Sequence, residues 1–428
     1  MHAVQDHRKQ LRRAIVAATV GTAIEWYDFF LYSTVTGLVF ARLFFPLANP
    51  LTGTLNAFGV YAVGFLARPV GAAIFGHYGD RLGRKAALVA TLLLMGIATF
   101  LVALVPTYDQ VGIWGAVLLT MLRFVQGVGV GGEWGGSVLL SIEWAQSNQH
   151  RGFIASWPQF GVPVGLFLAN LAVLAASGVS GNDFLTWGWR IPFLLSLALV
   201  GVGLYVRLGI VETPVFARLA ADRRIERAPV AEVFRRHTRE IVLTALCRMA
   251  EQAPFYIFTA FVFAYGADTL HVDRNFLLTA VLSASALSFI MIPLFGHLSD
   301  RAGRKRIYML GAVVTGAYGF LYFQLLDTQM PMLVFVGIFL SLIPHDMLYG
   351  PQAALIAESF PAHLRYSGAS LGYQLSSVIA GGPAPLVATW LLSRYQSGTA
   401  IAVFILICAV ITLAATALLK DYTNRDAA

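Results

Sequence analysis

The sequence is poor in charge and in cysteine. Only 12% of its 428 residues are charged, whereas about a quarter is usual in a soluble domain, and the mean hydropathy is +0.70. These values exclude an ordinary domain folded in water. The two cysteines, Cys247 and Cys408, both lie in apolar runs, so we expect neither a disulfide framework nor a cysteine metal site. Other metal-ligand clusters and nucleophile–base spacings are also missing, so the sequence predicts no metal and no enzyme.

Long apolar runs fill most of the chain instead. About twelve of them approach the ~20 residues that a transmembrane helix needs. We predict an all-α integral membrane protein with spans at 14–40, 52–75, 87–106, 111–138, 152–177, 189–210, 240–267, 275–297, 307–326, 331–357, 365–393 and 398–419. The first run is too long for the core of a signal peptide, so we interpret it as a retained span.

The positive charges indicate the topology. Most of the 30 Lys and Arg residues fall at the termini, in the even-numbered turns or in the central polar segment, and the opposite loops hold only Arg42, Arg190, Arg274 and Arg394. This bias predicts a multi-pass protein of the cell inner membrane with both termini in the cytoplasm. The net charge of +8 is then explained by loops that face an anionic leaflet, and we expect no nucleic-acid partner.

One long polar segment divides the chain. We predict a six-helix bundle over 1–210, a cytoplasmic linker with an amphipathic surface helix over 211–239, and a second six-helix bundle over 240–428. A regulatory partner site in the linker is the alternative.

A ten-residue motif occurs twice, about half the chain apart. Residues 76–85 read GHYGDRLGRK and residues 296–305 read GHLSDRAGRK, identical at seven of ten positions. Each copy lies between two apolar runs, so we expect a tight charged loop between two spans. Internal repeats of this kind are typical of secondary transporters. The alternative is a basic loop that sets the topology and arose twice by chance.

Ionisable residues within the first six spans are candidate functional groups, because such groups are costly in a membrane unless they face water or a partner. Glu25 and Asp28 are three residues apart and share one helix face. Both acids are near mid-membrane, which suits a proton carrier; a salt bridge between helices is the alternative. Arg123 precedes a glycine-rich run that includes Glu133, and its fork can hold a carboxylate. Pairing of Arg123 with Glu25 or Asp28 is the competing interpretation.

The second six spans contain a similar set. Arg248 and Glu251 are three residues apart, and they either serve a substrate or neutralise each other. His345 and Asp346 lie near mid-depth, either as a proton relay, because His titrates near physiological pH, or as a structural hydrogen bond. Further polar groups in or near spans five, seven and eleven are Gln159, Tyr256, Tyr373 and Gln374.

The chain resembles the major facilitator superfamily, and within it the metabolite:proton symporter family. The resemblance rests on the repeated GHxxDRxGRK motif and on AIEWYDFFLY (23–32), RFVQGVGVGGEWGG (123–136), WGWRIPFL (187–194), ETPVF (212–216) and RYSGASLGYQ (365–374). Arg248 with Glu251 and the trio His345-Asp346-Met347 look most like the shikimate-transporting branch. The resemblance implies two bundles that rock about a central cavity.

The resemblance also implies roles for the matching residues. The repeated motif would latch the cytoplasmic side, through Gly76, Asp80, Arg81, Gly83, Arg84 and Lys85 in the first copy and Asp300, Arg301, Arg304 and Lys305 in the second. The second copy differs at Leu298, Ser299 and Ala302.

Together these features predict a proton-coupled symporter, active as a monomer, that imports a shikimate-like hydroxylated carboxylate by alternating access. Asp28, assisted by Glu25, would carry the proton, which is the coupling ion, and no cofactor is expected. The substrate-binding candidates are Arg123, Arg248, Tyr27, Gln159, Tyr256, Glu251, His345, Asp346, Tyr373 and Gln374.

Alternative functions are a symporter of betaine- or proline-type zwitterions, favoured if Trp26, Tyr27 and Trp157 form a cation–π box, or a symporter of α-ketoglutarate or citrate. The remaining classes are a drug antiporter, a membrane enzyme and a sensor. The sequence shows no catalytic constellation for an enzyme and no signalling domain for a sensor.

Overall fold

The computed structural model describes residues 2–144, 150–209, 211–213, 217 and 229–423. Within these ranges the chain forms helices and turns and no strand. The helices are α1 (His2–Val35), the π-helix η1 (Thr36–Phe40), α2 (Ala41–Phe44), α3 (Pro50–Leu66), α4 (Arg68–Leu82), α5 (Arg84–Val102), α6 (Tyr108–Val111), α7 (Trp114–Trp144), α8 (Arg151–Ser180), the 3₁₀-helices η3 (Gly181–Phe184) and η4 (Gly188–Arg190), α9 (Ile191–Leu208), α11 (Pro229–Arg236), α12 (Thr238–Cys247), α13 (Met249–Tyr256), the π-helix η5 (Ile257–Phe261), α14 (Val262–Asp268), α15 (Arg274–Ala302), α16 (Arg304–Asp327), α17 (Pro331–Leu340), α18 (Leu342–Ala357), α19 (Arg365–Ser376), the π-helix η6 (Ser377–Gly381), α20 (Pro383–Tyr395) and α21 (Gly398–Leu418).

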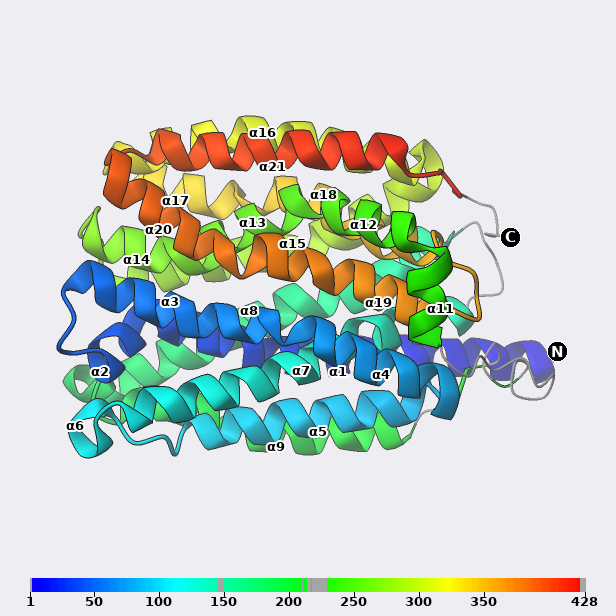
Figure 1. Cartoon of the computed structure of the whole chain (residues 1–428), viewed down its shortest axis with the longest axis horizontal. Coiled ribbons are helices and arrows are strands. Elements are labelled where there is room, and N and C mark those ends of the chain that lie inside the picture. The colour runs from blue at the N-terminus through cyan, green and yellow to red at the C-terminus, as the bar shows by residue number, and fades with distance from the viewer. Residues whose placement is uncertain (1, 145–149, 210, 214–216, 218–228, 424–428) are drawn as a thin grey trace.

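The long helices form one bundle with a common axis (Figure 1). In the described residues, eleven helical stretches are long and apolar enough to cross a membrane, and they match eleven of the predicted spans. Large apolar side chains such as Ile290, Val313 and Val410 are exposed on the outside of the bundle. An apolar exterior around a polar interior is the arrangement that a lipid bilayer favours.

The predicted seventh span, 240–267, is broken, which corrects the expectation of a single helix. The backbone of Arg248 leaves the helical region, with φ −89° and ψ 1°, and separates α12 from α13. Pro254 then lies inside α13 and cannot donate a backbone hydrogen bond. The π-helical turn η5 follows directly. The break frees backbone groups beside the charged pair Arg248 and Glu251.

The repeated motif is also more helical than predicted. α4 continues to Leu82 and α5 starts at Arg84, so the predicted loop is reduced to Gly83, with φ 109°. Gly303, with φ 96°, separates α15 from α16 in the same way. A single glycine in a conformation that side chains disfavour turns the chain, so the charged residues of the motif project from helix ends.

α1 begins and α21 ends at the same end of the bundle, which we call the termini end; the opposite end is the far end (Figure 1). Helices before the linker pack on helices after it, with α8 against α15 and α18, and α4 against α19. We refer to residues before 211 and after 239 as the first and second halves; the division at these positions stays a prediction. α11 lies across the termini end (Figure 1) and buries Val233 while Arg235 and Arg236 are exposed, as expected of a surface helix. Residues 214–216, which belong to the ETPVF motif, and 218–228 of the predicted linker lie outside the described ranges.

The glycine-rich run of α7 permits very close helix packing. A Cβ atom on Gly127 would lie 2.0 Å from the carbonyl oxygen of Gly64 on α3, and one on Gly131 would lie 2.1 Å from that of Arg68 on α4. Only a residue without a side chain fits at such distances. This packing brings Arg68 and Arg123 into the interior.

Candidate functional site

Asp28 lies on α1 with its carboxylate buried in the bundle. In the described part of the chain neither of its oxygens has a hydrogen-bond partner. Thr99 is the hydroxyl that faces Asp28, but it donates to the carbonyl oxygen of Met95 at 2.9 Å and accepts from Gln126 at 2.8 Å. A buried carboxylate without a partner is costly when ionised, and protonation removes that cost. The geometry is therefore suited to proton binding.

Arg123 lies on α7 and is fully buried. Its guanidinium donates to Gln126 Oε1 at 3.2 Å and to the carbonyl oxygen of Tyr61 at 3.4 Å. The rings of Phe29, Tyr32 and Tyr61 lie 4.1, 4.4 and 4.7 Å from its central carbon. No ion pair joins Arg123 to Glu25 or Asp28 across the described ranges, so the pairing interpretation is wrong for this conformation. Its Nη2 has no hydrogen-bond partner among the described residues, which leaves part of the fork for another anion.

Glu25 has a different partner, Arg207. Arg207 Nη1 lies 2.6 Å from Glu25 Oε1, and Nη2 lies 3.5 Å from Glu133 Oε1. Thr22 and Ser137 donate to the same oxygen of Glu133, and Thr91 donates to Glu25 Oε1 at 3.3 Å. The salt-bridge interpretation thus applies to Glu25, although not to Asp28.

Arg207 is not among the site residues predicted from the sequence. It falls near the end of the predicted span 189–210 and is buried in the last turn of α9. The available signal was the apolar run Ile191–Leu208, which continues past it. Nothing in that run identifies Glu25 and Glu133, on two other helices, as its partners.

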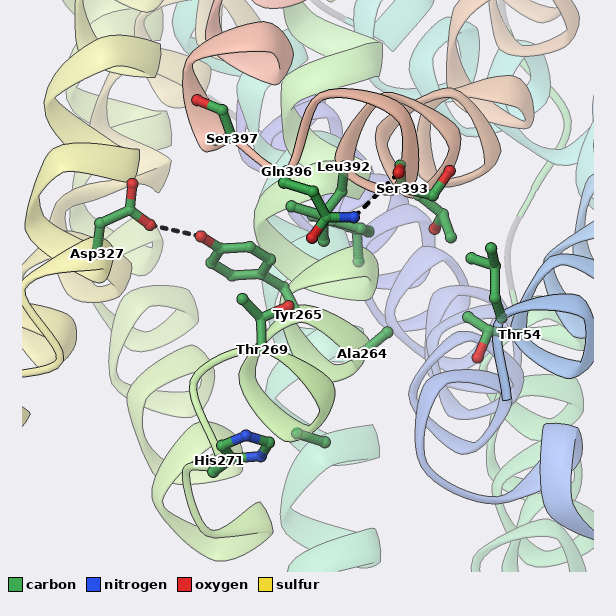
Figure 2. A pocket seen from close by; sticks show the side chains of 15 residues that line it. Thr54, Ala264, Tyr265, Thr269, His271, Asp327, Leu392, Ser393, Gln396 and Ser397 are labelled. Carbon is green, nitrogen blue, oxygen red and sulfur yellow. Dashed lines mark hydrogen bonds between the residues drawn. The ribbon is translucent and has the colours of Figure 1, made fainter. Parts of the chain in front are cut away.

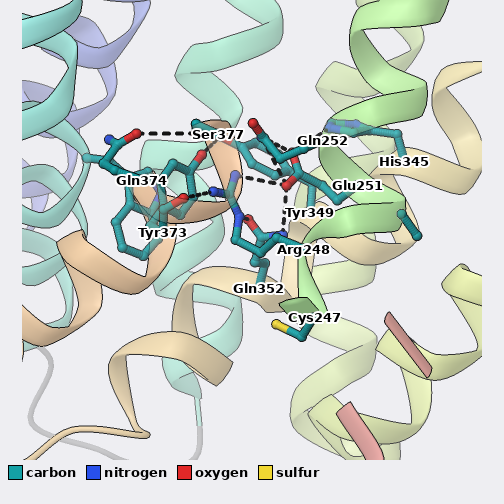
Figure 3. A network of polar contacts seen from close by, with 12 residues as sticks. Cys247, Arg248, Glu251, Gln252, His345, Tyr349, Gln352, Tyr373, Gln374 and Ser377 are labelled. Atoms are coloured by element: carbon teal, nitrogen blue, oxygen red, sulfur yellow. Dashed lines mark hydrogen bonds and ion pairs between the residues drawn. The ribbon is translucent and has the colours of Figure 1, made fainter. Parts of the chain in front are cut away.

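Arg248 lies at the centre of a polar network in the second half (Figure 3). Its guanidinium pairs with Glu251 Oε2 at 2.8 Å, donates to Gln352 Oε1 at 3.1 Å and donates to the carbonyl oxygen of Tyr373. The ring of Tyr373 lies 3.2 Å from its central carbon. The interpretation that Arg248 and Glu251 neutralise each other holds in this conformation.

His345 and Asp346 belong to the same network. His345 contacts Asp346 Oδ1 through Nδ1 at 3.0 Å and Glu251 Oε1 through Nε2 at 3.5 Å. Gln252 and Gln352 both donate to Glu251. The structure therefore brings together four predicted residues from α13, α18 and the break before α13.

Three predicted residues join the two halves. Gln159 on α8 donates to the carbonyl oxygen of Tyr349 at 3.2 Å and accepts from Trp134 at 2.8 Å. Gln374 donates to the carbonyl oxygens of α7, Val130 at 3.3 Å among them. Tyr373 stacks on Trp134 with ring centroids 3.8 Å apart. A layer of amide and aromatic groups thus lies between α7, α8, α18 and α19.

Tyr27 and Tyr256 are buried apart from this layer. The Tyr27 hydroxyl donates to the carbonyl oxygen of Pro192 at 2.7 Å, within the first half. The Tyr256 ring packs against Phe65 and Phe29, with centroids 4.9 and 6.2 Å away. Aromatic rings of α1, α3 and α13 therefore pack together across the two halves, beside Arg123.

Asp80, in the first copy of the motif, connects the halves at the termini end. It accepts hydrogen bonds from Ser367 through the backbone nitrogen at 3.2 Å and Oγ at 2.8 Å, in the first turn of α19. Arg84 lies 3.3 Å from Asp80 and 3.3 Å from Glu143, and a Cβ on Gly76 would lie 3.3 Å from Ser367 Cα. A carboxylate at a helix N-terminus is stabilised by free N–H groups and the helix dipole.

The second copy makes the mirrored contact. Asp300 accepts from the backbone nitrogens of Gly152 at 2.8 Å and Phe153 at 2.9 Å, in the first turn of α8. Arg304 lies 3.4 Å from Asp300 and 3.0 Å from Glu358. Burial raises the pKa of Glu358 to about 7, although Arg304 acts in the opposite direction. The changed residues of this copy do not prevent the contact between halves.

The other motif residues have local roles. Arg81 is exposed and contacts His77 at 3.2 Å. Lys85 Nζ donates to the carbonyl oxygen of Leu208, and Lys305 Nζ donates to those of Ala417 and Leu419. Arg301 is exposed. Both lysines thus tie the motif to the ends of neighbouring helices.

A cavity of about 640 Å³ lies at the far end, between the start of α3 and the second half (Figure 2). Tyr265 donates to Asp327 at 2.5 Å beside it. The described residues that line it include Thr54, His271 and Gln396, and none of the predicted substrate or proton residues. Asp28 and Arg123 are both buried, so this conformation is closed around them.

The family model of the Major Facilitator Superfamily matches residues 19–385, and the chain belongs to this superfamily. It is thus a multi-pass membrane transporter of small molecules and not an enzyme. The fold is similar to the solved structure of the xylose transporter XylE from E. coli in a partially occluded inward-open conformation. The TM-score is 0.78 at 17% sequence identity, and the superposition covers 98% of this chain and 100% of XylE. The predicted all-α fold is confirmed.

Curated relatives are similar over nearly their whole length. The shikimate transporter of Escherichia coli K12 is 41% identical over 418 residues, 96% of this chain and 94% of that protein. The inner membrane metabolite transport protein YhjE of the same organism is 38% identical with the same coverage. The proline/betaine transporter of that organism is 32% identical over 97% of this chain and 85% of its own. The identity to the shikimate transporter confirms that the sequence resembles this branch of the family.

Proposed function

We propose that this chain is a proton-coupled symporter that imports a small hydroxylated carboxylate of the shikimate type. The observation that carries the proposal is the pair of unsatisfied buried groups, the Asp28 carboxylate and Arg123 Nη2. The first is suited to a proton and the second to an anion. The similarity to a shikimate transporter supports the choice of substrate class.

Coupling follows from the charges. Because no described cation pairs with Asp28, its proton is retained while the site is closed. A substrate carboxylate held by Arg123 or Arg248 would add negative charge nearby and strengthen proton binding, and by reciprocity the proton would strengthen substrate binding. The amide and aromatic groups of Gln159, Tyr373 and Gln374 would hold the remainder of the substrate.

Alternating access requires the closed conformation to open at either end. The contacts of Asp80 and Asp300 close the termini end, which we assign to the cytoplasm because the positive loops lie there. The rings of Phe29 and Phe65, which pack on Tyr256 of the other half, would separate from it to admit substrate. We further propose that the protein works as a monomer in the inner membrane, with the proton as its coupling ion and without a cofactor.

Substitution of Asp28 by Asn tests the proton assignment. In proteoliposomes, we expect Asp28→Asn to abolish accumulation of labelled shikimate driven by a pH gradient, while counterflow exchange, which needs no net proton movement, continues. The matched control is Asp109→Asn, an exposed residue of α6, which should match the parent protein in both assays. Undiminished gradient-driven accumulation by Asp28→Asn would refute the assignment.

A symporter of betaine or proline is the second candidate, favoured by the similarity to the proline/betaine transporter. The structure lends it less support. Across the described residues no ring contact joins Trp157 to Trp26 or Tyr27; Trp157 packs on Phe153 and Phe160. Competition at fixed pH between shikimate and betaine for counterflow separates the candidates, because only the true substrate class slows exchange.

A further inference from the structure

Two buried carboxylates face one imidazole in the second half. His345 lies between Glu251 and Asp346, 3.5 Å from the first and 3.0 Å from the second. Its ring lies against Phe255 on one side and near Tyr349, with centroids 4.5 and 4.9 Å away. These rings hold the plane of the imidazole, and its two nitrogens contact the two acids.

Counting protons identifies what this arrangement holds. A neutral imidazole has a single N–H, and an ionised carboxylate only accepts hydrogen bonds. With a neutral ring, one of the two contacts would place a nitrogen lone pair against a carboxylate oxygen. An additional proton turns both contacts into hydrogen bonds. It also balances the charge, because Arg248 and a protonated His345 then match Glu251 and Asp346.

The other described residues that face the cluster supply no further charge. From α15 the facing polar group is Ser288, from α16 it is Tyr308, whose hydroxyl accepts from Gln352, and from α19 it is Tyr373, which contacts Tyr349. From α8 the contact is the amide of Gln159. The balance therefore depends on the arginine, the histidine and the two acids.

Glu251 is shared between the two cations of the network. Its Oε2 lies 2.8 Å from Arg248 and its Oε1 lies 3.5 Å from His345. A substrate carboxylate that binds Arg248 must therefore displace Glu251. It can do so most easily when a protonated His345 holds the displaced carboxylate.

We propose that Glu251, His345 and Asp346 form a second proton-binding site, separate from Asp28, and that its proton shifts Glu251 from Arg248 towards His345 so that a substrate carboxylate can bind Arg248. The role of Arg248 in this proposal rests on the proposed function. The proton-binding site itself does not, and the two parts are tested separately.

The proton is tested without substrate. In ¹⁵N-histidine-labelled protein in nanodiscs at pH 8, we expect one imidazole that carries protons on both nitrogens, and we expect its signal to vanish in His345→Gln. The matched control, His363→Gln, removes an exposed histidine and should leave that signal in place. A singly protonated His345 at pH 8 would overturn the proposal, and this outcome would not affect the assignment of Asp28.

The switch is tested with shikimate as the probe. In the parent protein, we expect the dissociation constant for shikimate to rise with pH above the point where the site loses its proton, by up to about tenfold per pH unit. Glu251→Gln, which cannot neutralise Arg248, should bind shikimate more tightly than the parent at high pH and keep only the part of the pH dependence that comes from Asp28. An unchanged pH dependence in Glu251→Gln would overturn the switch. Absence of shikimate binding in the parent at any pH would overturn the proposed substrate and leave the proton-binding site standing on the histidine signal.

Discussion

The buried charges of this transporter are satisfied in unequal ways. Arg207 pairs with two carboxylates and Arg248 with one. Within the described ranges Arg123 pairs with no carboxylate, and the Asp28 carboxylate has no hydrogen-bond partner. A buried ion pair contributes little net stability, but removing one partner leaves an uncompensated charge. We therefore expect the replacement of each of these residues to affect stability or transport in a different way.

Arg207→Met should strongly destabilise the protein. It leaves Glu25 and Glu133 buried without a cation, and breaking such a pair costs ~3–5 kcal/mol. We expect a lower unfolding temperature in detergent, partly restored in the double variant with Glu25→Gln because one stranded acid is then removed. Arg235→Met, at an exposed site of α11, is the control. An unchanged unfolding temperature for Arg207→Met would mean that water or another group replaces the guanidinium.

Glu358 predicts a pH dependence at the termini end. Its pKa is raised from 4.5 to about 7, chiefly by burial, so the folded protein binds the proton more tightly than the unfolded chain. The stabilisation from that proton is complete below pH ~4.5 and is lost as the pH rises through about 7. Glu358→Gln lacks this loss. We therefore expect the unfolding temperature of Glu358→Gln, relative to the parent, to be higher at pH 8 than at pH 5. A difference that is constant between these pH values would contradict the assigned pKa.

At the scale of helices, the apolar runs predicted most of what is seen. Eleven spans matched because hydrophobic length is a local property that the sequence displays directly. The seventh span and the repeated turns did not match, since single residues decide them. The helix breaks at Arg248, and one glycine replaces an expected loop. The partners of Arg207 and the contact of His345 with Glu251 could not be predicted either, because they depend on the packing of helices distant in sequence.

The two turning glycines predict a loss of stability on substitution. Gly83→Ala places a side chain at φ 109°, a conformation that costs ~1–3 kcal/mol for residues other than glycine. We expect a lower unfolding temperature for Gly83→Ala and for the equivalent Gly303→Ala. Gly201→Ala, on α9 where a Cβ meets nothing within 4 Å, should be neutral or slightly stabilising. Equal effects at Gly83 and Gly201 would show that the turn tolerates a side chain.

The whole molecule is held closed at the termini end by two related contacts. Asp80 binds the start of α19, and Asp300 binds the start of α8. Each acid comes from one half and each helix from the other, so both contacts must break before the halves separate at this end. The duplicated motif thus supplies two latches of the same chemistry, and their loss should favour the conformation open at the termini end.

Labelling of a buried cysteine measures this opening. Ser156 is fully buried where α8 meets α15, and a Cβ on Gly296 would lie 2.6 Å from its Cβ. In Ser156→Cys protein, we expect Asp80→Asn and Asp300→Asn each to speed the reaction with a membrane-impermeant maleimide, and both together to speed it most. The native Cys247 and Cys408 are buried and should contribute little background. Thr54→Cys, beside the far-end cavity, should instead react more slowly in the same variants, because opening one end closes the other. Faster labelling at both positions would show loosening of the whole bundle and would contradict a latch specific to the termini end.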